Sequence, residues 1–361
     1  MSASTRMAAI TRGEGCWFVP GGPDADLVLS TRVRLARNLD DVRFAPRASE
    51  RELRAILDDT RSAAGGVDGL SADDHLVMSD LGHLDRDVLV ERHLISSEFN
   101  QPEEWRALIL GRDDSLSVMV NEEDHLRIQG LRAGFQLYEA WDDVSAVDSA
   151  LGRQLAYAFR EDVGFLTACP SNVGTGLRVS VLMHLPALVL SQEVRKVIDS
   201  VQQIGLTVRG FYGEGSDVVG NFFQISNQIT LGKSEEELLD ILRQVTREVM
   251  QYEIEARGWL WSEARDQILD KVYRAEGTLQ HCRLISAAEV VAAASALRLG
   301  ISLGMQDMPS IEVLNRLVVF SQPAHVQRLA DRTLSSGEEN AARATLVRRL
   351  MTGGEPTNGE I

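Results

Sequence analysis

Two kinds of hydrophobic spacing divide the chain, and this division constrains its fold more than any other feature. In residues 178–185, Val179, Val181 and Met183 alternate with polar residues, which places them on one face of a strand. Similar short stretches predict strands at 27–35, 115–120, 206–212 and 222–231, whereas helical spacing dominates from residue 262 to residue 350. The sequence therefore predicts an α+β domain over residues 24–257, followed by a smaller all-helical domain over residues 258–350.

The ends of the chain and its longest apolar run argue against secretion and membrane insertion. Residues 1–15 lack the hydrophobic segment of a secretory signal. The alanine-rich run at 290–297 is far shorter than the ~20 residues that span a bilayer. We therefore expect a cytoplasmic protein whose ends, residues 1–23 and 351–361, are an N-terminal tail and a flexible C-terminal tail.

The charge balance excludes some classes of partner. The chain has 53 acidic and 37 basic residues, a formal net charge of -16, which argues against a general nucleic-acid binder or a polybasic membrane-surface protein. The cysteines, Cys16, Cys169 and Cys282, are widely spaced and form no CxxC pair, so neither a disulfide framework nor a cysteine zinc site is expected. No metal site made by protein residues is predicted. A local cationic site remains compatible with the net charge.

Five arginines stand next to predicted strands or turns: Arg32, Arg34, Arg127, Arg178 and Arg209. The chain has neither a GxxxxGK[ST] loop nor a GxGxxG turn after a strand, so the usual phosphate-binding loops are missing. Guanidinium groups bind phosphate oxygens in bidentate fashion and stay charged, so five of them together could neutralise a nucleoside triphosphate. A single arginine more often pairs with a surface carboxylate, and the residues alone leave that alternative open.

Two further segments carry reactive side chains. Residues 121–125, Asn-Glu-Glu-Asp-His, place three carboxylates at the end of an apolar strand, where their mutual repulsion calls for a nearby cation. The segment 169–176 begins with Cys169, which a neighbouring positive charge could stabilise as a thiolate. An acidic surface turn and an inert buried cysteine are the alternatives for these two segments.

Longer motifs connect these residues. Five segments, taken in this order, resemble the ATP:guanido phosphotransferase family: STRVRLARN (30–38), NEEDHLRI (121–128), TACPSNVGTGLR (167–178), RGFYGEG (209–215) and ISNQITLGKSEEE (225–237). The resemblance extends from about residue 24 to residue 258. It implies an antiparallel β-sheet flanked by helices, and transfer of the γ-phosphoryl group of ATP, with Mg²⁺, to a guanidinium nitrogen. The YGEG form of the fourth motif and the helical extension resemble the bacterial protein-arginine kinases within the family.

The resemblance also implies roles for single residues. Glu123 matches the family's catalytic carboxylate, Cys169 its reactive cysteine, and Asp217 a second acidic residue near the guanidinium. The nucleotide would be bound by Ser30, Thr31, Arg32, Val33, Arg34, His93, Arg127, Arg178, Val179, Ser180, Val181, Leu182, Arg209, Gly210, Phe211, Tyr212, Gly213 and Glu214. Glu123 is suited to orient a guanidinium and accept its proton, and a thiolate at Cys169 would add a second anion beside the cation.

Three positions depart from the family pattern. Asp217 replaces a glutamate and is one methylene shorter, and Tyr212 stands where the kinases of small substrates have an arginine. The bacterial enzymes often carry an RDxxRA motif that forms an allosteric phosphoarginine pocket. The corresponding residues here are Glu339-Asn340-Ala341-Ala342-Arg343-Ala344, in which Glu339 replaces an arginine by the opposite charge.

The resemblance implies an enzyme that phosphorylates arginine residues in proteins. The first motif begins only 30 residues from the start, so we expect no helical N-terminal domain of the kind found in animal creatine and arginine kinases, and hence an open acceptor pocket. By resemblance, the partners would include a stress-response repressor, clients of a Clp protease and an activator protein. We expect the C-terminal helices to form a homodimer. The alternatives are a kinase for free arginine or another small guanidino compound, and a non-catalytic adaptor that binds ATP or phosphoarginine.

Overall fold

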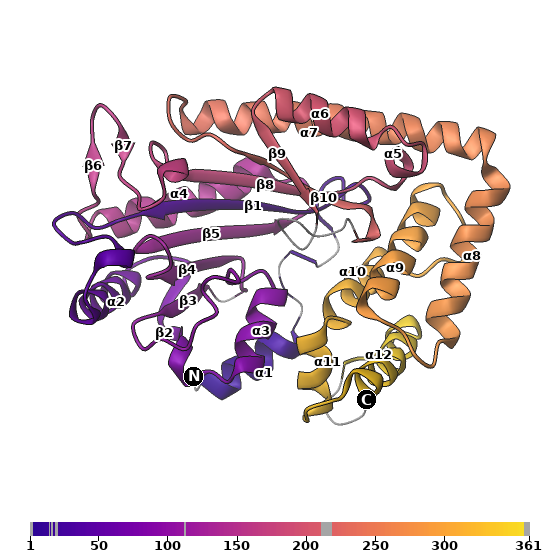
Figure 1. Ribbon diagram of the computed structural model, residues 1–361, viewed down its shortest axis with the longest axis horizontal. Helices are drawn as coiled ribbons and strands as arrows, with labels where there is room; N and C mark the ends of the chain where they lie inside the picture. The colour runs from indigo at the N-terminus through magenta and orange to yellow at the C-terminus, as the bar shows by residue number, and fades with distance from the viewer. Residues whose placement is uncertain are drawn as a thin grey trace. The chain divides into compact units, whose positions relative to one another are not determined.

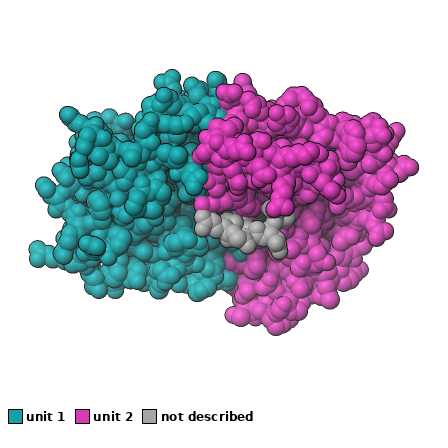
Figure 2. Space-filling view, turned by 45° about the horizontal axis from the view of Figure 1, so that its top comes forward, with its two compact units in different colours: residues 1–17, 30–180, 226–243 teal, residues 18–29, 181–225, 244–361 magenta. Residues whose placement is uncertain are grey.

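The computed structural model describes residues 3–13, 15, 17–18, 21–111, 113–210 and 219–356, apart from the side chains of residues 71–74. The chain forms two compact units, coloured teal and magenta in Figure 2. Unit 1 comprises residues 1–17, 30–180 and 226–243, and unit 2 comprises residues 18–29, 181–225 and 244–361. The domain boundary expected after residue 257 falls inside a single helix, α7 (Glu235–Glu263).

An eight-stranded sheet is the main β-structure of the chain (Figure 1). Its strands follow the order β2 (Leu70–Val77), β3 (Ala107–Gly111), β4 (Leu116–Val120), β5 (Leu126–Ala133), β1 (Val28–Arg37), β8 (Leu177–His184), β10 (Phe222–Asn227) and β9 (Leu206–Gly210). The pairs β2–β3, β3–β4, β4–β5 and β5–β1 are antiparallel. A separate two-stranded ribbon joins β6 (Phe159–Arg160) to β7 (Gly164–Phe165). The expected α+β class with an antiparallel sheet is confirmed.

Four helices belong entirely to unit 1: α1 (Ala3–Arg12), α2 (Glu50–Ala64), α3 (His83–Glu91) and α4 (Leu137–Gly152). Helix α2 begins with a capping box between Ser49 and Glu52, and it buries Leu53, Ile56 and Leu57 against β2, β3 and β4. Helix α4 packs on β5. Both helices thereby bury the apolar stripe that their sequences carry.

Helix α1 lies within the residues expected to form an N-terminal tail. Its Met7 and Ile10 side chains are buried. Arg6 forms an ion pair with Asp114 at 2.5 Å and donates a hydrogen bond to the backbone carbonyl of Gly111 at 2.9 Å. This part of the chain is therefore packed against the rest of unit 1.

Unit 2 is mainly helical. Besides most of α7, it contains α5 (Pro186–Leu190), α6 (Val194–Gln203), α8 (Arg265–His281), α9 (Ala287–Ser302), α10 (Ile311–Phe320), α11 (Pro323–Ala330) and α12 (Ser336–Met351). The apolar run at 290–297 lies in α9, which contacts α8, α10 and α12 and is buried on most of its surface. Small alanine side chains allow the neighbouring helices to approach α9 closely. No helix in the described part of the chain is both long and apolar enough to cross a membrane.

Candidate active site

The acidic segment 121–125 forms the tight connection between β4 and β5. Asn121 adopts a left-handed backbone conformation (φ 63°), and its amide donates to the carbonyl of His125 at 2.8 Å. The Asn121 side chain donates to the carbonyls of Leu53 and Trp105, at 2.9 and 2.7 Å. Asparagine tolerates the left-handed region better than most residues, and these bonds fix the turn in place. The three carboxylates of the turn are therefore presented by rigid backbone.

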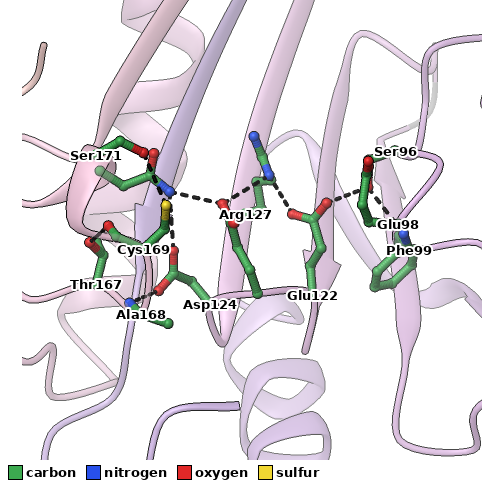
Figure 3. Close-up of polar contacts among 12 residues, drawn as sticks. Ser96, Glu98, Phe99, Glu122, Asp124, Arg127, Thr167, Ala168, Cys169 and Ser171 are labelled. Atoms are coloured by element: carbon green, nitrogen blue, oxygen red, sulfur yellow. Dashed lines mark hydrogen bonds and ion pairs between the residues drawn. The ribbon is translucent and has the colours of Figure 1, made fainter. Parts of the chain in front are cut away.

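Arg127, on β5, connects two of these carboxylates (Figure 3). Its Nη1 atom lies 2.6 Å from Glu122 Oε2 and 3.3 Å from Glu123 Oε1. Ser96 also donates its hydroxyl to Glu122. Burial alone would raise the pKa of Glu122, but Arg127 and Ser96 hold the pKa below its ordinary value. The Glu122 side chain is only 4% exposed, whereas that of Glu123 is 40% exposed and accessible to a second molecule.

The cysteine loop is bonded directly to the acidic turn. In the short helical turn Pro170–Asn172, the Asn172 side chain donates to Glu123 Oε1 at 2.9 Å and to Asp124 Oδ2 at 3.4 Å. Asp124 Oδ1 also accepts a hydrogen bond from the backbone amide of Ala168 at 2.6 Å. Cys169 Sγ lies 3.0 Å from the Ser171 hydroxyl, which can donate to a thiolate. The predicted catalytic residues Glu123 and Cys169 are thus held on segments that Asn172 and Asp124 join.

Four arginines from three neighbouring strands form a cationic cluster. Arg32 and Arg34 lie on β1, Arg127 on β5 and Arg178 on β8. Burial, followed by the charges of Arg127 and Arg178, lowers the pKa of Arg32 to about 10, and burial together with the other three arginines lowers the pKa of Arg34. Burial and the charges of Arg32 and Arg34 lower the pKa of His93 to about 3, so this imidazole is neutral at physiological pH.

Within this cluster, Arg34 has a donor atom that could bind an anion. The buried Nε atom of Arg34 has no hydrogen-bond partner among the described residues. Repulsion between like charges is costly in a folded protein unless a counter-charge offsets it. The donor set, several guanidinium groups and a neutral imidazole, fits the oxygens of a polyphosphate.

The structure separates the other predicted nucleotide residues into three groups. Val33, Val179, Val181 and Leu182 are buried core residues, as are Ser30, Thr31 and Ser180. Thr31 donates its hydroxyl to the carbonyl of Gly134 at 2.7 Å, a bond within the protein. Arg209 and Gly210 end β9 in unit 2. Phe211, Tyr212, Gly213 and Glu214 lie outside the described residues, and so does Asp217, which is predicted to lie near the guanidinium.

The residues that sequence reasoning passed over are those that join the motifs. The sequence groups Glu122 with two other acids and places Asn172 and Asp124 inside longer motifs, but it does not indicate the bonds between them. The sequence does contain a signal for Glu122, because a carboxylate directly after an apolar strand needs a cation nearby. Among the described residues, no group of three His, Cys, Asp or Glu side chains could hold a metal ion.

Replacing Asn172 by alanine should lower kcat roughly tenfold and leave KM for ATP unchanged, because removal of a supporting partner typically costs this much activity. The variant loses the bonds to Glu123 and Asp124 but keeps the arginine cluster intact. Steady-state kinetics at varied ATP concentration would measure both constants. Gln228→Ala, which removes an exposed amide from the same unit, is the matched control. A rise in KM for ATP with kcat unchanged would contradict the assigned role.

Together, the sheet, the arginine cluster and the carboxylate beside it would suit an enzyme that brings a polyphosphate close to a cationic acceptor. Residues 56–256 match the family described as ATP:guanido phosphotransferase, C-terminal catalytic domain. Residues 265–360 match the family described as Protein-arginine kinase McsB C-terminal domain. The chain belongs to the ATP:guanido phosphotransferase family.

Curated relatives place the chain more narrowly. A protein-arginine kinase of Symbiobacterium thermophilum is 46% identical over 349 residues, which cover 95% of this chain and 98% of the relative. Protein-arginine kinases of Halalkalibacterium halodurans and Bacillus subtilis are 44% and 42% identical over 93% of this chain, and the alignments cover 94% and 93% of the two relatives. Within its family, the chain is an enzyme of the protein-arginine kinase type.

Solved structures agree with the fold and the family. A lombricine kinase has a TM-score of 0.57 and 25% identity, covering 65% of this chain and 68% of that one. The duplicated taurocyamine kinase of Schistosoma mansoni with bound transition state analog components has a TM-score of 0.56 and 25% identity, covering 66% of this chain and 34% of that one. The family resemblance inferred from the motifs is therefore confirmed.

Proposed function

We propose that this chain transfers the γ-phosphoryl group of ATP to a guanidinium nitrogen of arginine residues in proteins. The observation that carries the proposal is the double role of Arg127. This side chain contacts the carboxylates of Glu122 and Glu123, and its charge also helps to lower the pKa of Arg32 within the cationic cluster. A phosphate bound by the cluster would therefore lie close to a cation bound by Glu123.

The chemistry that follows is a direct displacement. Arg32, Arg34, Arg127 and Arg178 would hold the phosphate oxygens and align the γ-phosphorus with the acceptor. Mg²⁺, bound with the nucleotide, supplies further neutralisation of phosphate charge. As the new N–P bond forms, the bond from the γ-phosphorus to the bridging oxygen breaks, and ADP leaves with that electron pair. Glu123 accepts the proton that the guanidinium nitrogen loses.

Cys169 is suited to support the acceptor. A protonated guanidinium is a poor nucleophile, with a pKa above ~12, so anions beside it must both bind and orient it. A thiolate at Cys169, stabilised by a hydrogen bond from the Ser171 hydroxyl 3.0 Å away, would act as a second anion next to Glu123. The role of Asp217 as a further acidic residue near the guanidinium is a proposal that rests on the sequence motif.

We favour protein substrates over free arginine because the curated relatives are protein-arginine kinases. Incubation with ATP–Mg²⁺ and either casein or free arginine, followed by mass spectrometry under non-acidic conditions, separates these substrates. We expect acid-labile phosphoarginine on casein. Phosphorylation of the free amino acid alone would indicate a kinase for small guanidino compounds, and no phosphorylation of either would indicate a binding adaptor; both outcomes would contradict the proposal.

The partners inferred from the resemblance are also proposals: cytoplasmic substrates that include a stress-response repressor and clients of a Clp protease, an activator protein, and a second copy bound through the C-terminal helices.

The segment Glu339–Ala344 bears on regulation. Buried Arg343 donates to the carbonyl of Ser321 at 2.7 Å, to that of Ile285 at 3.2 Å and to Asn340 Oδ1 at 2.6 Å, and it pairs with Glu339. Because these groups occupy its guanidinium, we propose that this segment does not recognise phosphoarginine.

A further inference from the structure

A groove of about 490 Å³ opens between helices α6 and α7 of unit 2, and the proposed catalytic chemistry makes no use of it. The uncharged residues of its α7 wall are Val245, Val249, Tyr252, Ala256 and Trp259. These residues follow one another at intervals of four, three, four and three, which is the heptad spacing of a helix that packs lengthwise against another helix. The spacing indicates that this stripe of α7 is built for a helical neighbour.

The stripe is additional to the face by which α7 is anchored in its own unit. On that other face, the buried Glu253 side chain accepts hydrogen bonds from the backbone amides of Ala187 and Leu188, each at 3.0 Å, and pairs with Arg257 at 2.8 Å. The heptad stripe, by contrast, is covered only at its floor. Val249 is buried, whereas Tyr252 is 51% and Trp259 55% exposed. Large aromatic side chains left exposed in a contiguous patch mark interaction surfaces.

Helix α6 and Ile204, the residue that follows it, supply the opposite wall with the same spacing. Val197, Val201 and Ile204 line the groove at intervals of four and three residues. Val201 is buried at the floor, and Ile204 is 51% exposed at the rim. Two walls with heptad spacing form a trough that matches the apolar face of one α-helix.

The charges along the rim select among such helices. Lys196 is paired with Glu193 at 2.7 Å, so its charge is already compensated. Glu248 and Glu255, seven residues apart on α7, accept hydrogen bonds from Gln244 and Gln251, and within the described residues neither carboxylate forms an ion pair with a cation. The rim is therefore acidic along the direction of the trough. A second copy of the chain would bring a surface with the same charge, in a molecule of net charge -16.

We propose that this groove is a docking site for a basic amphipathic α-helix of another protein. The partner helix carries apolar residues at heptad spacing and lysine or arginine residues beside them. Its apolar side chains fill the trough between Ile204, Tyr252 and Trp259, and its cations pair with Glu248 and Glu255. The apolar contacts supply most of the affinity, and the charges select the partner and its orientation.

The test uses two fluorescent helical peptides about three heptads long. Both have leucine at the heptad positions, and they differ only in having lysine or glutamate at the flanking positions. Fluorescence anisotropy with the full chain should show binding of the lysine peptide, and at least roughly tenfold weaker binding of the glutamate peptide. The difference should shrink as salt is raised.

Variants locate the binding. Trp259→Glu should weaken binding of the lysine peptide by roughly tenfold or more, whereas Ile254→Glu should leave it unchanged. Ile254 is the matched control because it is 48% exposed on the same helix and does not line the groove. Glu248→Lys combined with Glu255→Lys should reverse the preference between the two peptides.

Four outcomes would overturn the proposal. They are absence of binding by the lysine peptide, equal binding of both peptides, undiminished binding to Trp259→Glu, and a dimer that dissociates in the Trp259→Glu variant. The last of these, measured by light scattering of the full chain, would mean that a second copy occupies the groove. A dimer that persists in the variant, together with lost peptide binding, supports the proposal.

Discussion

Replacing Glu123 by glutamine should lower kcat for arginine phosphorylation by roughly 10²–10⁴-fold, the contribution expected from a positioned general base. Glutamine keeps the shape of the side chain. Its amide oxygen can accept the hydrogen bond that Asn172 donates to Glu123 at 2.9 Å in the wild type. It cannot take up the proton of the acceptor guanidinium. Arg127 keeps its shorter contact with Glu122, at 2.6 Å, so KM for ATP should stay close to that of the wild type. Quantifying phosphoarginine on casein at saturating ATP would measure the loss.

The neighbouring Glu98 provides a matched control (Figure 3). This carboxylate is exposed, and it accepts a hydrogen bond from the adjacent Ser97 hydroxyl at 3.0 Å. Glu98→Gln makes the same chemical change without touching the acidic turn, so its kcat should equal that of the wild type. Thermal unfolding should show both variants within about 0.5 kcal/mol of the wild type, as is usual for exposed substitutions. Glu123→Gln with wild-type activity would show that another group accepts the proton.

Local sequence patterns predicted several elements well and one boundary poorly. Of the alternating residues 178–185, all but the last lie in β8, and the helical spacing at 51–63 lies within α2. The helical spacing of apolar residues extends from residue 136 to residue 159, which predicts a longer helix than α4, which ends at Gly152. The next residues leave the helix because Tyr157 forms a bridge with Leu39, and the amide of Ala158 donates to the carbonyl of Asn38 at 2.8 Å. Partners more than a hundred residues away thus override a continuing apolar pattern.

Helix α1 illustrates the same limit. Met7 and Ile10 are its only large apolar residues, and its position depends on Arg6, whose partners Gly111 and Asp114 are more than a hundred residues away. Strand β2 contains aspartates and a histidine, which are poor strand formers, but it pairs with the fully buried β3. Only the folded sheet supplies these stabilising contacts, so neither element could be read from local periodicity.

For the candidate site, the motifs indicated which residues matter but not how those residues are bonded. The general expectation that an arginine pairs with a carboxylate holds for Arg37, which lies 2.8 Å from Asp148 and is buried. Arg34 differs: burial and the neighbouring arginines lower its pKa, and its buried Nε atom has no hydrogen-bond partner among the described residues. Arginines of both kinds stand in one motif, STRVRLARN. Only the folded structure distinguishes Arg37, whose guanidinium is bound by Asp148, from Arg34, which could bind a phosphate.

Replacing Arg34 by methionine should weaken ATP binding by roughly a hundredfold, since truncating a charged partner of a buried ion pair typically costs 2–5 kcal/mol. The same substitution should raise the stability of the nucleotide-free protein by ~1 kcal/mol, because replacing a buried charge by an apolar group of similar size is often stabilising. The direction of the pKa shift gives the sign: a cation whose pKa is lowered on folding destabilises the folded state at neutral pH. Calorimetric titration with ATP and thermal unfolding without it measure the two effects.

Arg54→Met is the matched control, because Arg54 forms an exposed ion pair with Glu104 at 2.6 Å on the surface of α2. Such pairs contribute little, so this variant should change neither ATP binding nor stability appreciably. If Arg34→Met instead destabilised the protein and bound ATP like the wild type, Arg34 would be a structural residue.

The linked pH dependence provides a second check on the cluster. As the pH rises through about 10, Arg32 loses its proton in the folded state before it does in the unfolded state, where its pKa is higher. The penalty of burying this charge is then relieved while affinity for phosphate falls, so nucleotide binding and the stability of the nucleotide-free protein should change in opposite directions.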